Sequence, residues 1–290
     1  MSAHTSSSHA PIGILDSGVG GLSVLRQINR LLPNEALLYA ADSAYIPYGD
    51  KTPAFVRQRV NAVAAALVER GAKALVVACN TATAAAVESL RERYAMPVVG
   101  MEPGVKPAVQ SSRSGVVGIL ATAGMVESRR MADLVRRFAG DREVIIQACP
   151  GLVEQVERLA LETPETAQLL KQYLEPITAR GADTLVLGCT HYPFLRPLLE
   201  RLVGPKVSVV DTGEAVARRL KYLLEQGALL NPAKAGANTR FYTTAQPESQ
   251  REMFSRLLGA PIEVEPLPDV PPAGSNEELS QNENEPETTT

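Results

Sequence analysis

Short apolar runs alternate with longer amphipathic stretches over most of this chain. Several of the runs are continuously apolar, which is typical of strands buried on both faces of a parallel sheet. The stretches between them repeat their apolar positions at helical spacing. This alternation predicts an α/β fold with doubly wound, mostly parallel sheets. The predicted strands are 12–16, 37–41, 74–78, 97–101, 116–121, 143–148, 184–188, 206–210 and 240–244, and the clearest predicted helices are 53–70, 82–93, 125–139, 165–180 and 212–226.

Three segments of the sequence recur in the same order further along the chain. Their spacings are nearly equal, so a chance likeness among parallel strands is the weaker explanation. The repeats therefore predict two homologous halves. The matched pairs are IGILDS (12–17) with VGILAT (117–122), ALVVACN (74–80) with TLVLGCT (184–190), and VVGMEPG (98–104) with VSVVDTG (207–213).

Composition narrows the functional classes without choosing one. The 290 residues are 45% hydrophobic and 21% charged, which is enough apolar material for a substantial core. A net charge of −3 offers no basic surface for nucleic acid or anionic lipid. No apolar run reaches the ~18–20 residues that span a bilayer, so we expect no membrane association.

The two ends of the chain differ from the rest. Residues 1–10 and 267–290 are polar, and the second of these segments is acidic and rich in Pro, so we expect two disordered tails around a folded part at 11–266. The first ten residues lack the features of a secretory signal. The three Cys are an odd number in a long chain, which favours free thiols in a reducing cytoplasm.

Two of the three Cys occupy equivalent places in the two repeats. Cys79 follows ALVVA and Cys189 follows TLVLG, each just beyond the carboxyl end of a predicted buried strand, where ligands bind in open α/β sheets. Cys79 also precedes a predicted helix, whose first amides would favour a thiolate. A buried Cys alone is more often a small apolar side chain. The matched pair favours a chemical role, whereas Cys149 has no such partner.

The first strand ends in Asp16, followed by Ser17 and a glycine-rich turn at 18–21. Glycines allow a tight turn and a close backbone approach to a ligand, and the exposed amides could hold a carboxylate or phosphate. A dinucleotide fingerprint is the rival interpretation. The segment lacks the last Gly of that motif, and Asp16 would repel a phosphate.

His191 lies two residues after Cys189 and is the only His outside residues 1–10. Beside a strand-end Cys, an acid/base or orienting role is the favoured interpretation. A zinc site formed by Cys79, Cys189 and His191 is conceivable, but no C-x-x-C pair accompanies it. A pyridoxal phosphate enzyme needs a Schiff-base Lys, and none follows these strands. We therefore expect no metal and no cofactor.

Four motifs follow one another along the chain and extend over nearly the whole predicted folded part. They are DSGVGGLSVLR at 16–26, ADSAYIPYGDK at 41–51, ACNTATA at 78–84 and GCTHYPFL at 188–195. Together these motifs resemble the glutamate racemase family, part of the cofactor-independent aspartate/glutamate racemase superfamily.

This resemblance implies an architecture and a reaction. It implies two similar α/β domains related by a pseudo-twofold axis, with the active site in the cleft between them. We place one at 11–100 plus 210–266 and the other at 101–209. The implied reaction interconverts L- and D-glutamate without a cofactor and supplies D-glutamate for peptidoglycan. The resemblance also implies glutamate as the small-molecule partner and a possible homodimer.

The resemblance also assigns roles to individual residues. Cys79 and Cys189 match the catalytic cysteines, Asp16 and His191 match their acid/base partners, and Glu157 matches a Glu near the second Cys. From spacing alone, Glu157 reads equally well as a solvated helix charge. Many family members have a second Thr where Met125 stands here, so one substrate carboxylate contact is lost or replaced. The implied substrate contacts are Asp16, Ser17, Tyr48, Gly49, Asn80, Thr81, Thr122, Thr190 and His191.

The chemistry explains why two thiols are needed. Inverting Cα requires removal of a weakly acidic proton from one face and delivery of another to the opposite face. The resemblance implies that Cys79 takes the proton from D-glutamate and Cys189 takes it from L-glutamate. Aspartate racemase, or a related superfamily enzyme, is an alternative, and a non-catalytic two-lobed amino-acid-binding protein is a more distant one.

Overall fold

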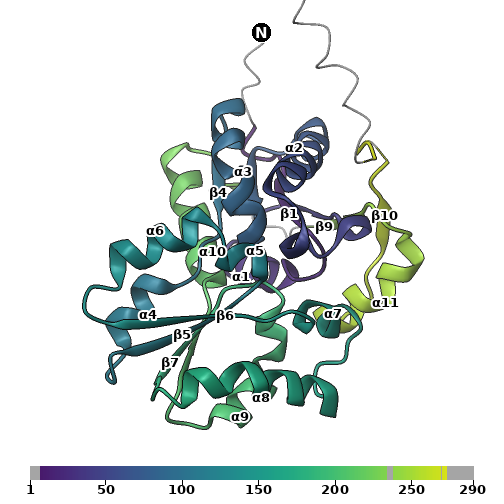
Figure 1. The fold of residues 1–290 in the computed structure, drawn as a ribbon. Coiled ribbons are helices and arrows are strands. Elements are labelled where there is room, and N and C mark those ends of the chain that lie inside the picture. Colours follow the sequence, from purple (N-terminus) through teal and green to yellow (C-terminus); the bar gives the residue numbers. More distant parts are fainter. Residues whose placement is uncertain (1–6, 234–237, 269, 273–290) are drawn as a thin grey trace, which may run out of the picture.

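The computed structural model describes residues 7–233, 238–268 and 270–272 and contains two separate parallel sheets (Figure 1). The predicted α/β fold is confirmed. In the described residues the first sheet has the order β10-β9-β2-β1-β3-β4, and the second has the order β6-β5-β7-β8. The strands are β1 Ile12–Asp16, β2 Leu37–Ala41, β3 Ala74–Val77, β4 Val98–Gly100, β5 Val116–Ala121, β6 Glu143–Ala148, β7 Thr184–Leu187, β8 Ser208–Val210, β9 Thr239–Thr243 and β10 Val264–Pro266.

Helices cover the sheets on both faces (Figure 1). The predicted helix at 125–139 is two helices, because Thr122 and Ser128 each accept a hydrogen bond from a backbone amide three residues on and so begin a helix of their own. The helices are α1 Leu22–Leu31, α2 Pro53–Glu69, α3 Asn80–Arg93, α4 Val105–Ser111, α5 Ala123–Val126, α6 Arg129–Phe138, α7 Leu152–Glu157, α8 Pro164–Thr178, α9 Arg196–Val203, α10 Gly213–Gln226 and α11 Pro247–Leu258, with short 3-10 turns η1 Ser43–Tyr45, η2 Tyr48–Asp50 and η3 Tyr192–Leu195.

The repeats are reflected in the topology. The order β2-β1-β3-β4 in the first sheet matches β6-β5-β7-β8 in the second. Ile12 pairs with Ala74 in one sheet and Val117 pairs with Thr184 in the other, as the first two matched segments require. The third match is displaced: Leu75 pairs with Val98, whereas Leu185 pairs with Val209 rather than Val207. The residues of β8 that correspond to β4 therefore lie two positions further along the chain than the sequence match indicates.

Among the residues that the structure describes, three apolar cores hold the fold together. One lies within the first sheet and α2 and α3, and another lies within the second sheet and α4 to α6. The largest contains residues of both halves, including Leu25 of α1 and Val156 of α7. The two halves therefore share one continuous core that includes residues of α1 and α7.

The folded part extends beyond the predicted end at 266. Leu267 donates its amide to the Thr243 carbonyl, and both Leu267 and Val270 are buried in the core of the first sheet. Near the other end, the Ser8 carbonyl accepts a hydrogen bond of 2.5 Å from the buried Lys73 ammonium. The remaining parts of the predicted tails, residues 1–6 and 273–290, lie outside the described residues.

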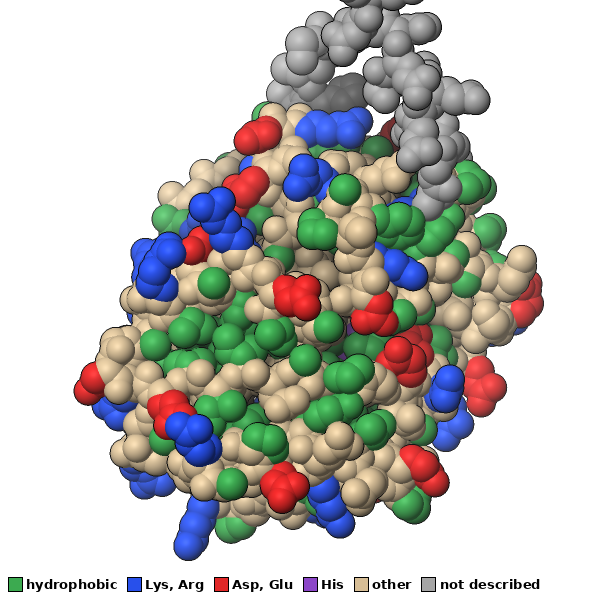
Figure 2. All heavy atoms as spheres, in the orientation of Figure 1, with side chains coloured by type: hydrophobic (Ala, Val, Ile, Leu, Met, Phe, Trp, Pro, Cys, Tyr) green, Lys and Arg blue, Asp and Glu red, His purple; other side chains and the backbone are tan. Residues whose placement is uncertain are grey.

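Two observations concern the nucleic-acid-binding and membrane-associated classes of protein considered above. On the face shown in Figure 2, acidic and basic side chains are interspersed. Within the described part of the chain, no helix has the length and apolar character needed to cross a bilayer.

Candidate active site

The carboxyl ends of strands from both sheets meet at one narrow cavity. Its free volume is about 10 Å³, which is room for about one water molecule. Both Cys79, which follows β3, and Cys189, which follows β7, line this cavity. The structure therefore brings the two matched thiols to one site. The lining residues are Ser17, Pro47, Tyr48, Gly49, Cys79, Asn80, Thr81, Thr122, Val153, Gly188, Cys189, Thr190 and His191.

Cys79 stands at the N-terminus of α3 and its thiol is buried. Its Sγ accepts a hydrogen bond of 3.4 Å from the Ala82 amide and lies 3.9 Å from Ser17 Oγ. We expected the helix amides to favour a thiolate. That contact is present, but burial and the nearby Asp16 carboxylate outweigh it and raise the pKa of Cys79 well above its usual range. Cys79 is therefore held as a neutral thiol.

Asp16 lies behind the cavity wall, where its carboxylate accepts hydrogen bonds from both halves. Ser17 donates to it through its amide and through its hydroxyl at 3.0 Å, and Thr190 of the other half donates at 3.0 Å. Burial nevertheless raises the pKa of Asp16 to about 6, although His191 and these donors lower it. Asp16 can therefore exchange a proton near neutral pH.

Cys189, His191 and Glu157 form a chain of hydrogen-bonding groups. Cys189 Sγ lies 3.7 Å from His191 Nδ1, and His191 Nε2 lies 2.7 Å from Glu157 Oε1. Burial alone would lower the pKa of His191, but the hydrogen bonds with Cys189 and Glu157 raise it well above its usual value. The imidazolium thus formed lies where it stabilises negative charge on the Cys189 sulfur.

The glycine-rich turn of the first half packs directly against this chain in the second half. Val19 donates its amide to Glu157 Oε1 at 3.0 Å. A Cβ at Gly20 would lie 2.5 Å from Thr190 Oγ1 and 2.7 Å from His191 Cε1, and one at Gly18 would overlap the Glu157 carboxylate. These glycines therefore allow the backbone of one half to reach the acid/base groups of the other.

Several neutral hydrogen-bonding groups complete the cavity. Asn80 is buried, and among the described residues neither its Oδ1 nor its Nδ2 has a partner. Thr81 Oγ1 and Thr122 Oγ1 lie 3.0 Å apart across the two halves. An unsatisfied buried amide is costly, so Asn80 is suited to bind a polar ligand.

The predicted residues divide into two groups. All of them except Asp16 and Glu157 line the cavity, and those two contact its lining residues Ser17 and His191. Pro47, Val153 and Gly188 also line it and were not predicted. Met125 is buried in the core of the second half, with its Sδ 3.8 Å from Ser128 Oγ, and so does not replace a cavity-lining Thr.

The third Cys, Cys149, does not line the cavity. Cys149 Sγ donates to the Gln147 carbonyl at 3.4 Å, and burial raises the pKa of this thiol to about 12. Over the described residues, no group of three or more His, Cys, Asp and Glu is placed to hold a metal ion.

Comparisons with known proteins agree with this geometry. The Asp/Glu/hydantoin racemase family model matches residues 12–220. A glutamate racemase from Ectopseudomonas mendocina is 55% identical over 258 residues, which cover 89% of this chain and 98% of that protein.

Two crystal structures are similar along nearly their whole length. Glutamate racemase isoform RacE1 from Bacillus anthracis superposes with a TM-score of 0.82 at 36% identity, covering 89% of this chain and 97% of that one. Escherichia coli glutamate racemase in complex with L-glutamate and the activator UDP-MurNAc-Ala gives a TM-score of 0.78 at 35% identity, with the same coverage. The chain therefore belongs to the Asp/Glu/hydantoin racemase family and is an amino-acid racemase.

Proposed function

We propose that this enzyme interconverts L- and D-glutamate by a two-base mechanism in which Cys79 and Cys189 act on opposite faces of Cα. The observation that carries the proposal is the meeting of two matched thiols, one from each half, at a single narrow cavity. The relatives named glutamate racemase and the L-glutamate complex of the E. coli enzyme support glutamate as the substrate.

The two thiols begin the reaction in different states. Cys79 is held as a neutral thiol by burial and by Asp16, whereas Cys189 faces the His191 imidazolium. With L-glutamate bound, Cys189 removes the Cα proton as a thiolate and Cys79 donates its own proton to the opposite face. The C–H bond on one face breaks as a new one forms on the other, and the negative charge moves from Cys189 to Cys79. D-glutamate reverses these steps.

Proton supply at each sulfur comes from the neighbouring groups. Asp16, with a pKa near 6, can exchange a proton with the Cys79 side, and His191 with Glu157 can do so on the Cys189 side. The developing carbanion is stabilised by fixed donors in the cavity wall, namely the unpartnered Asn80 amide and the Thr81 hydroxyl.

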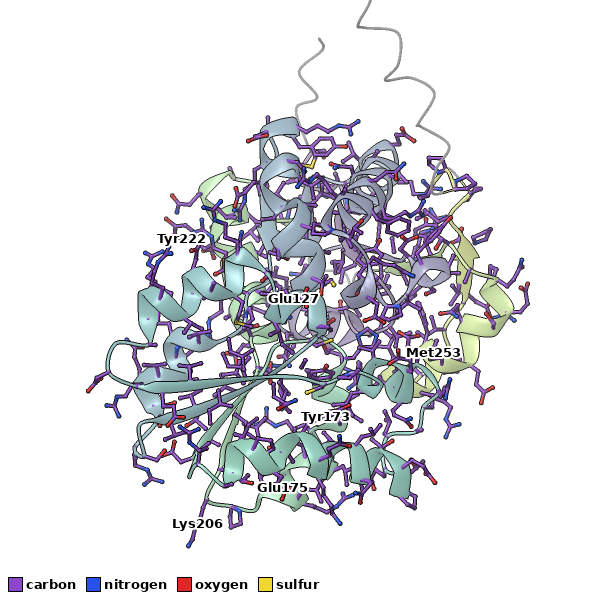
Figure 3. All side chains as sticks on the ribbon, in the orientation of Figure 1. Glu127, Tyr173, Glu175, Lys206, Tyr222 and Met253 are labelled. Carbon is purple, nitrogen blue, oxygen red and sulfur yellow. The ribbon has the colours of Figure 1, made fainter. Side chains whose placement is uncertain are left out.

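Substrate entry requires the cavity to widen. A space for about one water cannot hold glutamate, so part of its wall must move. The halves share a core that includes Leu25 of α1, whereas η2 and α5 meet through the close approach of Gly49 and Gly124, next to the Thr81–Thr122 contact. A larger surface pocket is lined by residues from both sides of this contact, among them Gly49, Gly124 and Glu127, the last of which is labelled in Figure 3. We propose that glutamate enters there.

Replacement of each thiol tests the mechanism. Cys79→Ala and Cys189→Ala should each abolish racemisation, measured by circular dichroism from pure L- and pure D-glutamate with chelator present and no added cofactor. Cys149→Ala is the matched control and should retain activity, because Cys149 does not line the cavity and its thiol donates to the Gln147 carbonyl. Wild-type turnover in either of the first two variants would exclude the two-base scheme.

Two further assays separate the alternatives. Aspartate as a better substrate than glutamate would identify an aspartate racemase. A non-catalytic binding protein would bind glutamate without exchanging its Cα proton with deuterium oxide.

We also propose that the enzyme supplies D-glutamate for peptidoglycan, because its relatives are named glutamate racemase. Loss of the enzyme should then create a requirement for D-glutamate. A homodimer stays a prediction, to be tested by light scattering.

A further inference from the structure

The cavity-lining loop at 43–50 is fixed by a buried ion pair that lies outside the cavity. Tyr48 lines the cavity, but its hydroxyl points away from it and donates to Asp42 Oδ2 at 2.6 Å. The Asp42 carboxylate is fully buried and also receives Arg59 Nε at 2.9 Å and Arg59 Nη2 at 2.8 Å. Thr244 Oγ1 donates to Asp42 Oδ1 at 2.8 Å, the oxygen that Arg59 Nη2 also contacts, and accepts a hydrogen bond from the Ala44 amide. Asp42 therefore ties the loop to α2.

The Arg59 guanidinium contacts a carboxylate, an aromatic ring and a backbone carbonyl. It makes a two-pronged contact with Asp42, lies 4.1 Å from the centre of the Tyr45 ring, and donates through Nη1 to the Pro271 carbonyl. Only 2% of Arg59 is exposed. A planar, fully engaged guanidinium fixes its partners more rigidly than a single point charge would.

The C-terminal segment, of which the structure describes residues 267–268 and 270–272, closes this arrangement from outside. Leu267 continues from β10 by donating its amide to Thr243, and Leu267 and Val270 belong to the same core as Tyr48 and Val56 of α2. The Pro271 carbonyl then reaches Arg59. A continuous set of contacts thus runs from the C-terminal segment through Arg59 and Asp42 to Tyr48.

We propose that Asp42 and Arg59 are positioning residues of the active site, and that the C-terminal segment completes their environment. The inference rests on the proposed function. Its physical basis is the tightness of the cavity: a Cβ at Gly49 would lie only 2.7 Å from Thr122 Cβ in the other half. A loop displaced by a few tenths of an ångström therefore changes both the cavity wall and the contact between the halves.

Tyr48→Phe tests the link to the loop with little loss of packing. It removes the hydroxyl that Asp42 holds and leaves the ring in the wall. Tyr242→Phe is the matched control, because Tyr242 lies in the same core and its hydroxyl has no partner among the described residues. We expect KM for glutamate to rise roughly tenfold in Tyr48→Phe, with an unchanged pH profile of kcat, and to stay constant in Tyr242→Phe. Arg59→Lys, which keeps the charge but loses the two-pronged contact, should resemble Tyr48→Phe.

Two truncations test the C-terminal segment. A chain that ends at Pro268 lacks Val270 and Pro271, whereas a chain that ends at Pro272 keeps every described contact. We expect KM to rise in the first and to equal the wild-type value in the second. A lower melting temperature with an unchanged KM at 25 °C in the shorter chain and in Tyr48→Phe would show a purely structural role and overturn the inference.

A second measurement keeps this test independent of the reaction. A displaced loop exposes Cys79, so iodoacetamide should alkylate Cys79 roughly tenfold faster in Tyr48→Phe than in Tyr242→Phe, measured by mass spectrometry of the peptide. If the wild-type enzyme does not racemise glutamate but this difference appears, the proposed function fails and the positioning role stands. Equal alkylation rates overturn the positioning role whatever the substrate.

Discussion

The Glu157 carboxylate is held by the imidazole of one half and by a backbone amide of the other, so Glu157→Gln probes the acid/base arrangement at its centre. Gln has nearly the same shape and keeps an oxygen that can accept the Val19 amide. It loses the negative charge that His191 Nε2 contacts at 2.7 Å. The substitution therefore changes the electrostatics of His191 with little change in packing.

The size of the effect follows from that contact. A hydrogen bond to a charged group contributes about 1.5–3 kcal/mol, and about 1.4 kcal/mol corresponds to a factor of ten in rate. Without the Glu157 charge, the pKa of His191 should fall towards its usual value. Because an imidazolium is then less populated beside Cys189, we expect kcat/KM to fall about 10- to 100-fold at neutral pH.

The raised pKa of His191 also makes the free energy of unfolding depend on pH, in a direction that can be worked out. A His whose pKa is raised on folding stabilises the folded state below its unfolded pKa, and this contribution is lost as pH rises through the folded pKa. In Glu157→Gln that loss should occur at lower pH than in the wild-type enzyme. NMR titration of the His191 ring and urea unfolding at several pH values measure the two effects.

Racemisation supplies an internal check for the assay. Enantiomers have equal free energies, so kcat/KM must be equal from L- and from D-glutamate, in the variant as in the wild type. Glu154→Gln, the same change three residues earlier on α7, is the control and should leave the activity unchanged. An unaltered kcat/KM together with an unaltered His191 titration in Glu157→Gln would refute this account of the acid/base pair.

Three other substitutions test separate parts of the site. Folded Asp16, with a pKa near 6, keeps a proton that the unfolded chain loses near pH 4, so the unfolding free energy should fall by about 3 kcal/mol between about pH 4 and pH 7; urea unfolding of Asp16→Asn should lack this contribution. Gly124→Ala places a Cβ 2.8 Å from the Gly49 carbonyl and should raise KM roughly tenfold in initial-rate assays, because the halves can no longer meet. Gly20→Ala pushes against His191 and should lower kcat at least about tenfold while the protein still unfolds cooperatively.

The strand pattern could be predicted closely because burial on both faces leaves an unbroken apolar run. The predicted strands 12–16, 37–41, 116–121 and 143–148 have the observed bounds. β10 was not predicted, because Val264–Pro266 is short, ends in Pro and, as the edge strand of its sheet, pairs only with β9. Helix breaks such as that at Ser128 depend on a side-chain cap that periodicity does not reveal.

The site was partly predictable for a similar reason. Cys79, Cys189 and Asp16 all come at or just after strand ends, so the topology of a parallel sheet already brings them to one edge. Glu157 could not be distinguished from a solvated charge by spacing, since its partners Val19 and His191 are distant in the chain. Asp42 was missed, although it follows β2 much as Asp16 ends β1, and its Arg59 partner is visible only in the fold.

The duplicated halves have kept their thiols and diverged around them, and this difference has a kinetic consequence. The Asp42 amide donates to the Asp16 carbonyl, and at the equivalent place the Cys149 amide donates to Ala121, so the second half has no counterpart of the Asp16 carboxylate. Burial and the Asp16 carboxylate raise the pKa of Cys79, and an imidazolium lies beside Cys189, so the resting enzyme is biased towards carrying a proton on Cys79. In the proposed mechanism this state acts directly on L-glutamate, whereas D-glutamate needs the opposite one. Because kcat/KM must be equal for the two enantiomers, this bias can appear only as kcat and KM values that differ between them by one common factor. Identical kcat and identical KM in both directions would mean that the two thiols share their proton equally, despite their different surroundings.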